Sequence, residues 1–126
     1  MRSSLEQKLW KKGITPPGYI KVEPEVVGLI TGFLEELRKL APEQEVVATL
    51  DWAYRLESRE DLHDKSKWGD PFVRIGGLEK EKVAPEEIEK IGDIELIIQI
   101  PQDICAQAKE RRICCKPGHK SRMELR

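Results

Sequence analysis

The stretch Asp93–Ile100 is the sequence feature that most constrains the fold. It reads Asp-Ile-Glu-Leu-Ile-Ile-Gln-Ile, with five Ile or Leu residues in eight positions, and it lies between Gly92 and Pro101. An apolar run this short, bounded by glycine and proline, is typical of a strand with both faces covered. Pro101 also removes a backbone donor at the point where strand pairing should end. We therefore expect a buried strand here, with the rest of the chain arranged around it.

Two longer segments have clear periodicity. From Pro24 to Leu40 apolar residues recur at helical spacing, which predicts an amphipathic helix. Gly28 and Gly32 lie one turn apart in it and suggest that another backbone approaches closely. Glu45–Glu57 alternates apolar and polar residues, which favours a strand over the rival helix that Pro42-Glu43 would start.

The remaining elements are read from glycine and proline. Gly76-Gly77 predicts a tight hairpin turn between strands at 72–75 and 78–83, in which the charged residues from Glu79 to Lys82 protect an exposed edge. A short helix is expected over 84–91, and a final helix from Pro101 through about Ile113.

These elements predict an α+β fold. The chain has 126 residues, which suits a single domain. We expect a mostly antiparallel sheet of about four strands, covered by helices on one face. Residues 1–20 should form an N-terminal helix and a proline-rich connector, residues 21–113 the α+β core, and residues 114–126 a basic, flexible tail.

The order of these elements resembles that of A-type iron–sulfur carrier domains. The resemblance covers element order alone. Leu78 stands where that family has a cysteine after its paired glycines, and Cys114-Cys115 replaces its closing Cys-Gly-Cys. No functional residue is carried across from that family.

Charge is unevenly distributed. Charged residues make up 36% of the chain at a net charge of −1, but residues 109–126 hold seven basic residues against Glu110 and Glu124. Such a basic segment can contact an acidic protein or nucleic-acid phosphates. It contains no Phe or Tyr, so base stacking is not offered.

The three cysteines and a histidine form one candidate metal set. Cys105, Cys114, Cys115 and His119 carry ligand types that suit zinc or an iron–sulfur cluster. The alternative is a core residue at Cys105 and a cysteine pair in a frayed tail. Thiol chemistry at Cys114-Cys115 is a third reading, because nearby arginines and Lys116 would lower a thiol pKa. An odd number of cysteines argues against a disulfide framework, and the cytoplasm is the expected compartment.

The polar stretch 58–71 predicts a loop. Its Asp and His residues suit turns and solvation as well as a cation site. Trp68 either packs this loop onto the domain or offers an aromatic side chain to a partner.

The sequence carries no phosphate-binding loop, dinucleotide fingerprint or nucleophile elbow. It also has no signal peptide or membrane span, and catalysis is not expected. We expect a non-catalytic binding or adaptor module that contacts another protein through the Trp68 loop or the basic tail. A metal- or thiol-dependent protein is the alternative, and a nucleic-acid accessory protein is the third hypothesis. The candidate partner-binding residues are His63, Trp68, Arg111, Arg112, Lys116 and Lys120.

Overall fold

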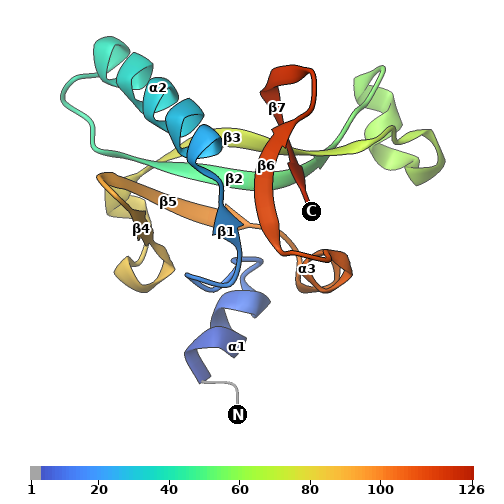
Figure 1. Ribbon diagram of the computed structural model, residues 1–126, viewed down its shortest axis with the longest axis horizontal. Coiled ribbons are helices and arrows are strands. Elements are labelled where there is room, and N and C mark those ends of the chain that lie inside the picture. Colours follow the sequence, from blue (N-terminus) through green and yellow to red (C-terminus); the bar gives the residue numbers. More distant parts are fainter. Residues whose placement is uncertain (1–3) are drawn as a thin grey trace.

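The computed structural model describes residues 4–126, except for the side chains of residues 119–121. Within this range the chain forms a mixed sheet with the strand order β1-β6-β7-β3-β2-β5-β4 (Figure 1). The strands are β1 Lys21–Val22, β2 Val46–Tyr54, β3 Pro71–Glu79, β4 Glu89–Ile91, β5 Ile94–Gln99, β6 Arg112–Lys116 and β7 His119–Leu125. The α-helices are α1 Ser4–Lys11, α2 Pro24–Leu40 and α3 Gln102–Gln107. Short 3-10 turns cover Arg59–His63, Lys65–Lys67, Lys80–Lys82 and Pro85–Glu87.

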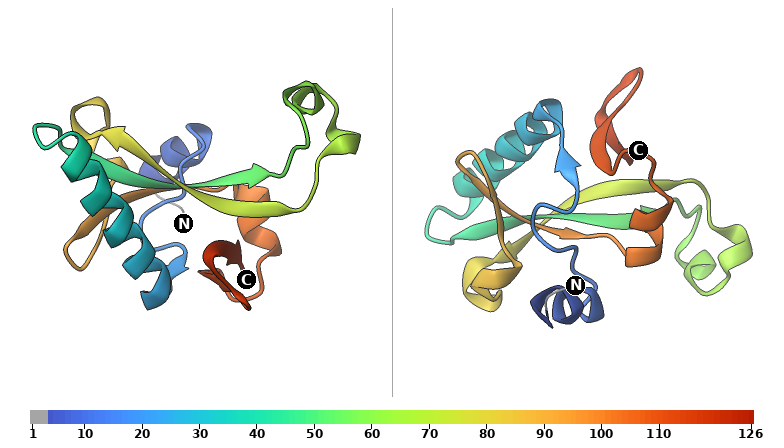
Figure 2. Two further views of the ribbon diagram at one scale, coloured as in Figure 1. Left: turned by 90° about the horizontal axis from the view of Figure 1, so that it is seen from above. Right: turned by 60° about the horizontal axis from the view of Figure 1, so that its bottom comes forward.

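The expected four-stranded, mostly antiparallel sheet with helices on one face is wrong. The described residues form a seven-stranded sheet that curls into a half-barrel (Figure 2). Two neighbouring pairs, β1 with β6 and β2 with β5, are parallel. Helix α2 lies against one face of the sheet and α1 against the other (Figure 1). The extra strands were missed because they are short or rich in charged residues, so their apolar alternation is weak.

Strands β2 and β5 confirm the strands predicted at Glu45–Glu57 and Asp93–Ile100. Ala48 and Leu50 on β2 pair in parallel register with Leu96 and Ile98 on β5, and all four are fully or almost fully buried. These side chains belong to the same core as those of Val26 and Ile30 on α2, which are also buried. The side chains of Val47 and Ile97 lie in a second, smaller core with Leu9 of α1 and Ile14. The strand Asp93–Ile100 is therefore covered on both faces, as its sequence predicts.

The predicted hairpin at Gly76-Gly77 is wrong, because β3 runs straight through both glycines. A Cβ on Gly76 would lie 2.7 Å from Thr49 Oγ1, and one on Gly77 would lie 3.2 Å from Leu37 Cδ1 of α2. The glycines thus allow close packing against β2 and α2. The tight turn lies instead at Gly92-Asp93 between β4 and β5, where Gly92 has a φ of 60°.

Two predicted helices are also corrected. The expected helix over 84–91 is a 3-10 turn followed by β4. The final helix ends at Gln107, and Arg111, with a φ of 51°, precedes strand β6. The segment predicted as a flexible tail supplies most of β6 and all of β7. Its cysteines and arginines are therefore held in a sheet.

Helix α2 confirms the predicted amphipathic helix. The expected close approach of another backbone to its two glycines is wrong. Among the described residues, no neighbouring atom lies within 4 Å of a Cβ placed on Gly28 or Gly32. Within residues 4–126, no helix has the length and apolar character needed to cross a membrane.

Candidate functional site

A groove of about 370 Å³ lies beside β3, at the place where β7 meets it. Four consecutive residues of β3 line it, although successive side chains of a strand point to opposite faces of the sheet. The groove therefore runs along the edge of the strand. Its lining residues are Arg55, Phe72, Val73, Arg74, Ile75, Arg122 and Met123.

The groove exists because β3 and β7 barely pair. Their register consists of a single pair, Val73 with Met123, whereas β6 and β7 pair along most of their length. On the other side, β3 pairs with β2 over the whole of Val46–Tyr54. Beyond Val73, the outer edge of β3 has no strand partner in the part of the chain that the structure describes.

Three arginines and four apolar residues line this groove. The half-buried Phe72 lies on the same face of β3 as Arg74, whereas Val73, which pairs with Met123, points to the opposite face. Val73 and Met123 are only 2% and 4% exposed. Arg74 makes two hydrogen bonds to Asp51, of 2.6 Å from Nη2 and 3.2 Å from Nε. The pKa of the Arg74 guanidinium is raised, mainly by these hydrogen bonds and to a smaller extent by the negative charge of Asp51.

The other two arginines are exposed, and neither has a side-chain ion pair within the described residues. Arg55 follows β2, and its N–H donates to Asp70 O at 3.3 Å, which extends the β2–β3 ladder by one pair. Arg122 lies on β7 next to Met123. Two charges are thus available to a ligand, whereas Arg74 is oriented by Asp51.

The loop that carries Trp68 begins next to this groove and projects beyond the sheet (Figure 1). The Trp68 ring lies 4.9 Å from the Tyr54 ring between centroids, and its Nε1 donates to Asp61 O at 2.9 Å. Trp68 therefore packs the loop onto the end of β2. Asp64 stabilises the loop itself, since its carboxylate accepts hydrogen bonds from the backbone and the hydroxyl of Ser66. His63 is exposed at the end of a 3-10 turn.

The candidate metal residues do not gather into a visible site. Cys105 is buried in the main core, and Cys114 and Cys115 are adjacent on β6, so their side chains point to opposite faces. Among the described residues, no group of three potential ligands could hold a metal ion. The side chain of His119 lies outside the described residues. Burial raises the pKa of all three thiols, contrary to the lowering expected from neighbouring arginines.

Two of the basic residues predicted to bind a partner, Arg111 and Arg112, are engaged within the fold. The guanidinium of Arg111 lies 4.8 Å from the centre of the Tyr19 ring. Arg112 forms ion pairs with Glu23 at 3.5 Å and with Glu110 at 2.6 Å. Lys116 is exposed, whereas the side chain of Lys120 lies outside the described residues. The structure thus does not bring the six partner-binding candidates together.

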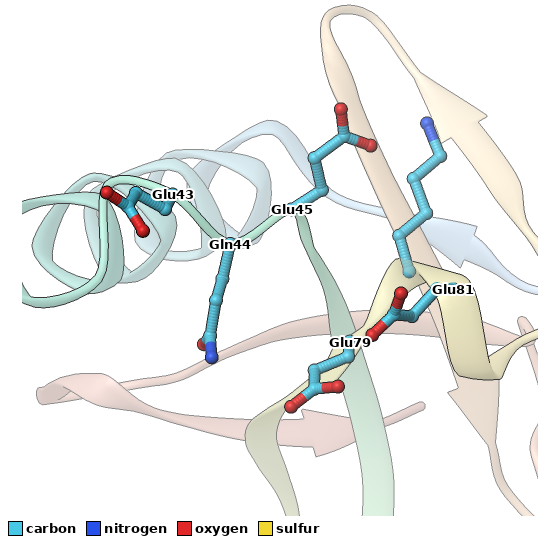
Figure 3. Close-up of a pocket in the computed structure, with 6 residues that line it drawn as sticks. Glu43, Gln44, Glu45, Glu79 and Glu81 are labelled. Carbon is cyan, nitrogen blue, oxygen red and sulfur yellow. The ribbon is translucent and has the colours of Figure 1, made fainter.

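A second pocket, of about 530 Å³, lies at the opposite end of the β2–β3 pair (Figure 3). Its lining residues are Glu43, Gln44, Glu45, Glu79, Lys80 and Glu81. Gln44 and Glu45 point in different directions from their segment (Figure 3), and Lys80 is bonded to Glu95 at 2.9 Å. This pocket is acidic but has no converging set of carboxylates.

Comparison of the chain with protein-family models finds no match, and neither the curated proteins nor the solved structures include one that is detectably similar. Sequence reasoning missed Arg55. Arg122 was included only as one of the seven basic residues of 109–126, and Phe72 and Arg74 only as members of a predicted strand.

Proposed function

We propose that this protein is a non-catalytic binding module that holds an acidic segment of another protein in the groove beside β3. The observation that carries the proposal is the presence of Arg55, Arg74 and Arg122 at one groove whose other lining residues are apolar. Guanidinium groups bind carboxylates through charge-assisted, often bidentate hydrogen bonds. The half-buried side chain of Phe72 can add affinity when a ligand covers it.

The position of the groove supports the proposal, because two surfaces suggested by the sequence converge there. The Trp68 loop starts directly after Arg55, and Arg122 belongs to the basic C-terminal segment. A ligand in the groove would contact the base of the loop and strand β7 together. The basic segment contributes through Arg122, since Arg111 and Arg112 are occupied elsewhere.

Asp51 prepares Arg74 for this role. The two hydrogen bonds fix the guanidinium plane, so less side-chain entropy is lost when a ligand binds. A carboxylate ligand would then be attracted mainly by Arg55 and Arg122, while Arg74 contributes a rigid wall. We therefore expect Arg55 and Arg122, which have no ion pair within the described residues, to dominate affinity.

The test is a binding titration by fluorescence anisotropy. The probe is a blocked, labelled octapeptide in which glutamate and valine alternate. The variant is Arg55→Gln with Arg122→Gln, which we expect to bind at least about tenfold more weakly, because charge-assisted hydrogen bonds are lost. The matched control is Lys8→Gln with Lys11→Gln, which removes the same charge from α1, a helix that does not line the groove.

Wild-type affinity in the control, together with weak binding by the arginine variant, would support the proposal. Equal weakening in both variants would show non-specific attraction and overturn it. Lack of any binding by the wild-type protein would overturn it as well. A single-stranded oligothymidine that binds the arginine groove more tightly than the peptide would favour the nucleic-acid hypothesis instead.

A further inference from the structure

We infer that the acidic segment binds as an additional strand along the outer edge of β3, at residues 74–79. This inference rests on the proposed function and specifies its geometry. Its basis is the unpaired edge of β3 next to the arginine groove. An extended peptide that joins such an edge gains main-chain hydrogen bonds, and its side chains then determine specificity.

The register of β2 and β3 identifies the backbone groups that are offered. Lys80 N donates to Glu45 O at 3.0 Å, and the register continues without a break from Val46–Glu79 to Tyr54–Pro71. In an antiparallel ladder, hydrogen-bonded and non-hydrogen-bonded pairs alternate. The even-numbered residues of β3 therefore bond to β2, whereas the odd-numbered residues direct N–H and C=O groups outward.

The outward residues are Val73, Ile75, Gly77 and Glu79. Val73 pairs with Met123 of β7, which agrees with this alternation. The next three have no partner strand among the described residues. They offer the N–H and C=O groups of a short strand, which is enough for a peptide of a few residues. The 3-10 turn Lys80–Lys82 closes the far end of the edge.

The side chains of β3 predict the sequence pattern of the ligand. Arg74 and Phe72 share a face with Asp51, as their pairing with β2 requires. Val73, Ile75 and Gly77 lie on the face that packs against α2. A ligand strand should therefore alternate acidic residues beside Arg74 with apolar residues beside Ile75.

Charge favours a separate acidic chain over a second copy of this protein. A second copy would pair antiparallel through the same edge and would place its own residues 78–80 beside the groove. Those residues are Leu78, Glu79 and Lys80, which carry no net charge. An acidic segment places carboxylates at those positions instead, so complementarity selects it.

The decisive test uses the alternating peptide with N-methylated backbone amides. One version carries N-methyl groups on all odd amides, and the other carries them on all even amides. An added strand directs only every second amide toward β3. We therefore expect one version to lose at least about tenfold in affinity and the other to keep the affinity of the parent peptide.

Equal affinities of the two versions, or loss of binding in both, would overturn strand addition. If binding still depended on Arg55 and Arg122, the proposed function would stand while this inference failed. The two results are therefore distinguishable.

Variants of the protein give an independent check. Ile75→Pro removes an outward N–H without removing a bond to β2, so proline is tolerable there as on edge strands. Ile75→Val keeps the N–H and serves as the matched control. We expect peptide binding to fall at least about tenfold for the proline variant only. Unchanged binding by a folded Ile75→Pro variant would overturn the inference. The inference would also fail if the unliganded protein were a dimer and this substitution made it monomeric. If the proline variant does not fold, the N-methylated peptides decide alone.

Discussion

The two halves of the sheet are held together differently. In one half, β2 pairs with β3 along its whole length and with β5 at four positions, and the residues between them are buried. In the other half, β1, β6 and β7 join the rest of the sheet through the single pair Val73–Met123. The candidate groove therefore lies at the seam between the two halves, next to the Val73–Met123 pair, where continuous strand pairing stops and an edge of β3 becomes accessible.

The energetics of the two halves should differ accordingly. Burial of large apolar side chains such as Leu50 and Ile98 contributes about 1.5–3 kcal/mol each. The β6 side relies partly on ion pairs, including Arg112 with Glu23 and Glu110. Arg112 and Glu23 are partly buried, so the cost of removing their charges from water offsets much of the attraction between them. We therefore expect the β1–β6–β7 half to be the less stable region.

The largest expected effect is a cavity in the well-paired half. Leu50→Ala should lower the free energy of unfolding by a value near the top of the range of about 2–5 kcal/mol, because the surrounding core cannot collapse. Met123→Ala at the seam should lie near the bottom of that range. Urea unfolding of both variants measures the difference. Equal losses would show that the two halves are equally rigid.

A second substitution tests how closely β2 and β3 pack in the well-paired half. Gly76→Ala places a methyl group 2.7 Å from Thr49 Oγ1 and should cost about 1–3 kcal/mol. Thr49→Ala removes that oxygen, so the double variant should recover part of the loss. Thermal unfolding of the single and double variants measures this coupling. Strictly additive losses would contradict the predicted clash.

Amide hydrogen exchange compares the local stability of the two halves without mutation. We expect amides of β7 to exchange at least about tenfold faster than those of β2 and β5, because local opening of β7 breaks few contacts with β3. Mass spectrometry of peptic fragments provides the measurement. Similar protection throughout the sheet would show that both halves open only by global unfolding.

The smallest expected effect concerns a carboxyl group at the well-paired side of the sheet. Burial raises the pKa of Glu89 above its ordinary value near 4.5, although a hydrogen bond from Gly18 N at 3.0 Å partly offsets the shift. The folded protein therefore binds the proton more tightly than the unfolded chain. The stabilising contribution of this group is present below about pH 4.5 and is lost as the pH rises through the folded-state pKa.

Glu89→Gln keeps an acceptor oxygen but no longer titrates. We expect this variant to have the same urea midpoint as the wild-type protein near pH 4 and a slightly higher midpoint at pH 7. Glu86→Gln, at an exposed neighbouring position, is the control. A variant that loses stability at pH 7 would contradict the predicted direction.

The sequence predicted the well-paired half far better than the other half. The sequence patterns are strong there because each segment packs apolar residues into a core. They are the apolar run of Asp93–Ile100, the alternation of Glu45–Glu57 and the helical spacing of α2. Strand β6 instead places two charged residues around Ile113 and the cysteines, so its five residues resemble the end of a helix. Gly76-Gly77 satisfies the pattern of a turn equally well, and only the positions of Thr49 and Leu37 show why small residues are needed.

The candidate site was largely hidden from sequence reasoning. Arg55 and Arg122 come from distant parts of the chain, and only the meeting of β3 and β7 brings them to one groove. The metal hypothesis depended on spacing, which cannot show that two adjacent cysteines in a strand face opposite ways. The sequence left two alternatives for Trp68, packing of the loop or contact with a partner, and its contact with Tyr54 supports the packing role.

The pairing of β1 with β6 has a consequence for how the chain acquires its structure. Lys21 pairs with Arg112, so a strand near the start of the sequence can form only when a strand near the end is present. Closing so large a loop before any contact forms is entropically unfavourable and slows folding. During synthesis, the β2–β3 ribbon can assemble early, whereas β1 gains its neighbour only after residue 113 has been made. Late docking of the β6–β7 hairpin should therefore be the last and slowest step, and it completes the groove.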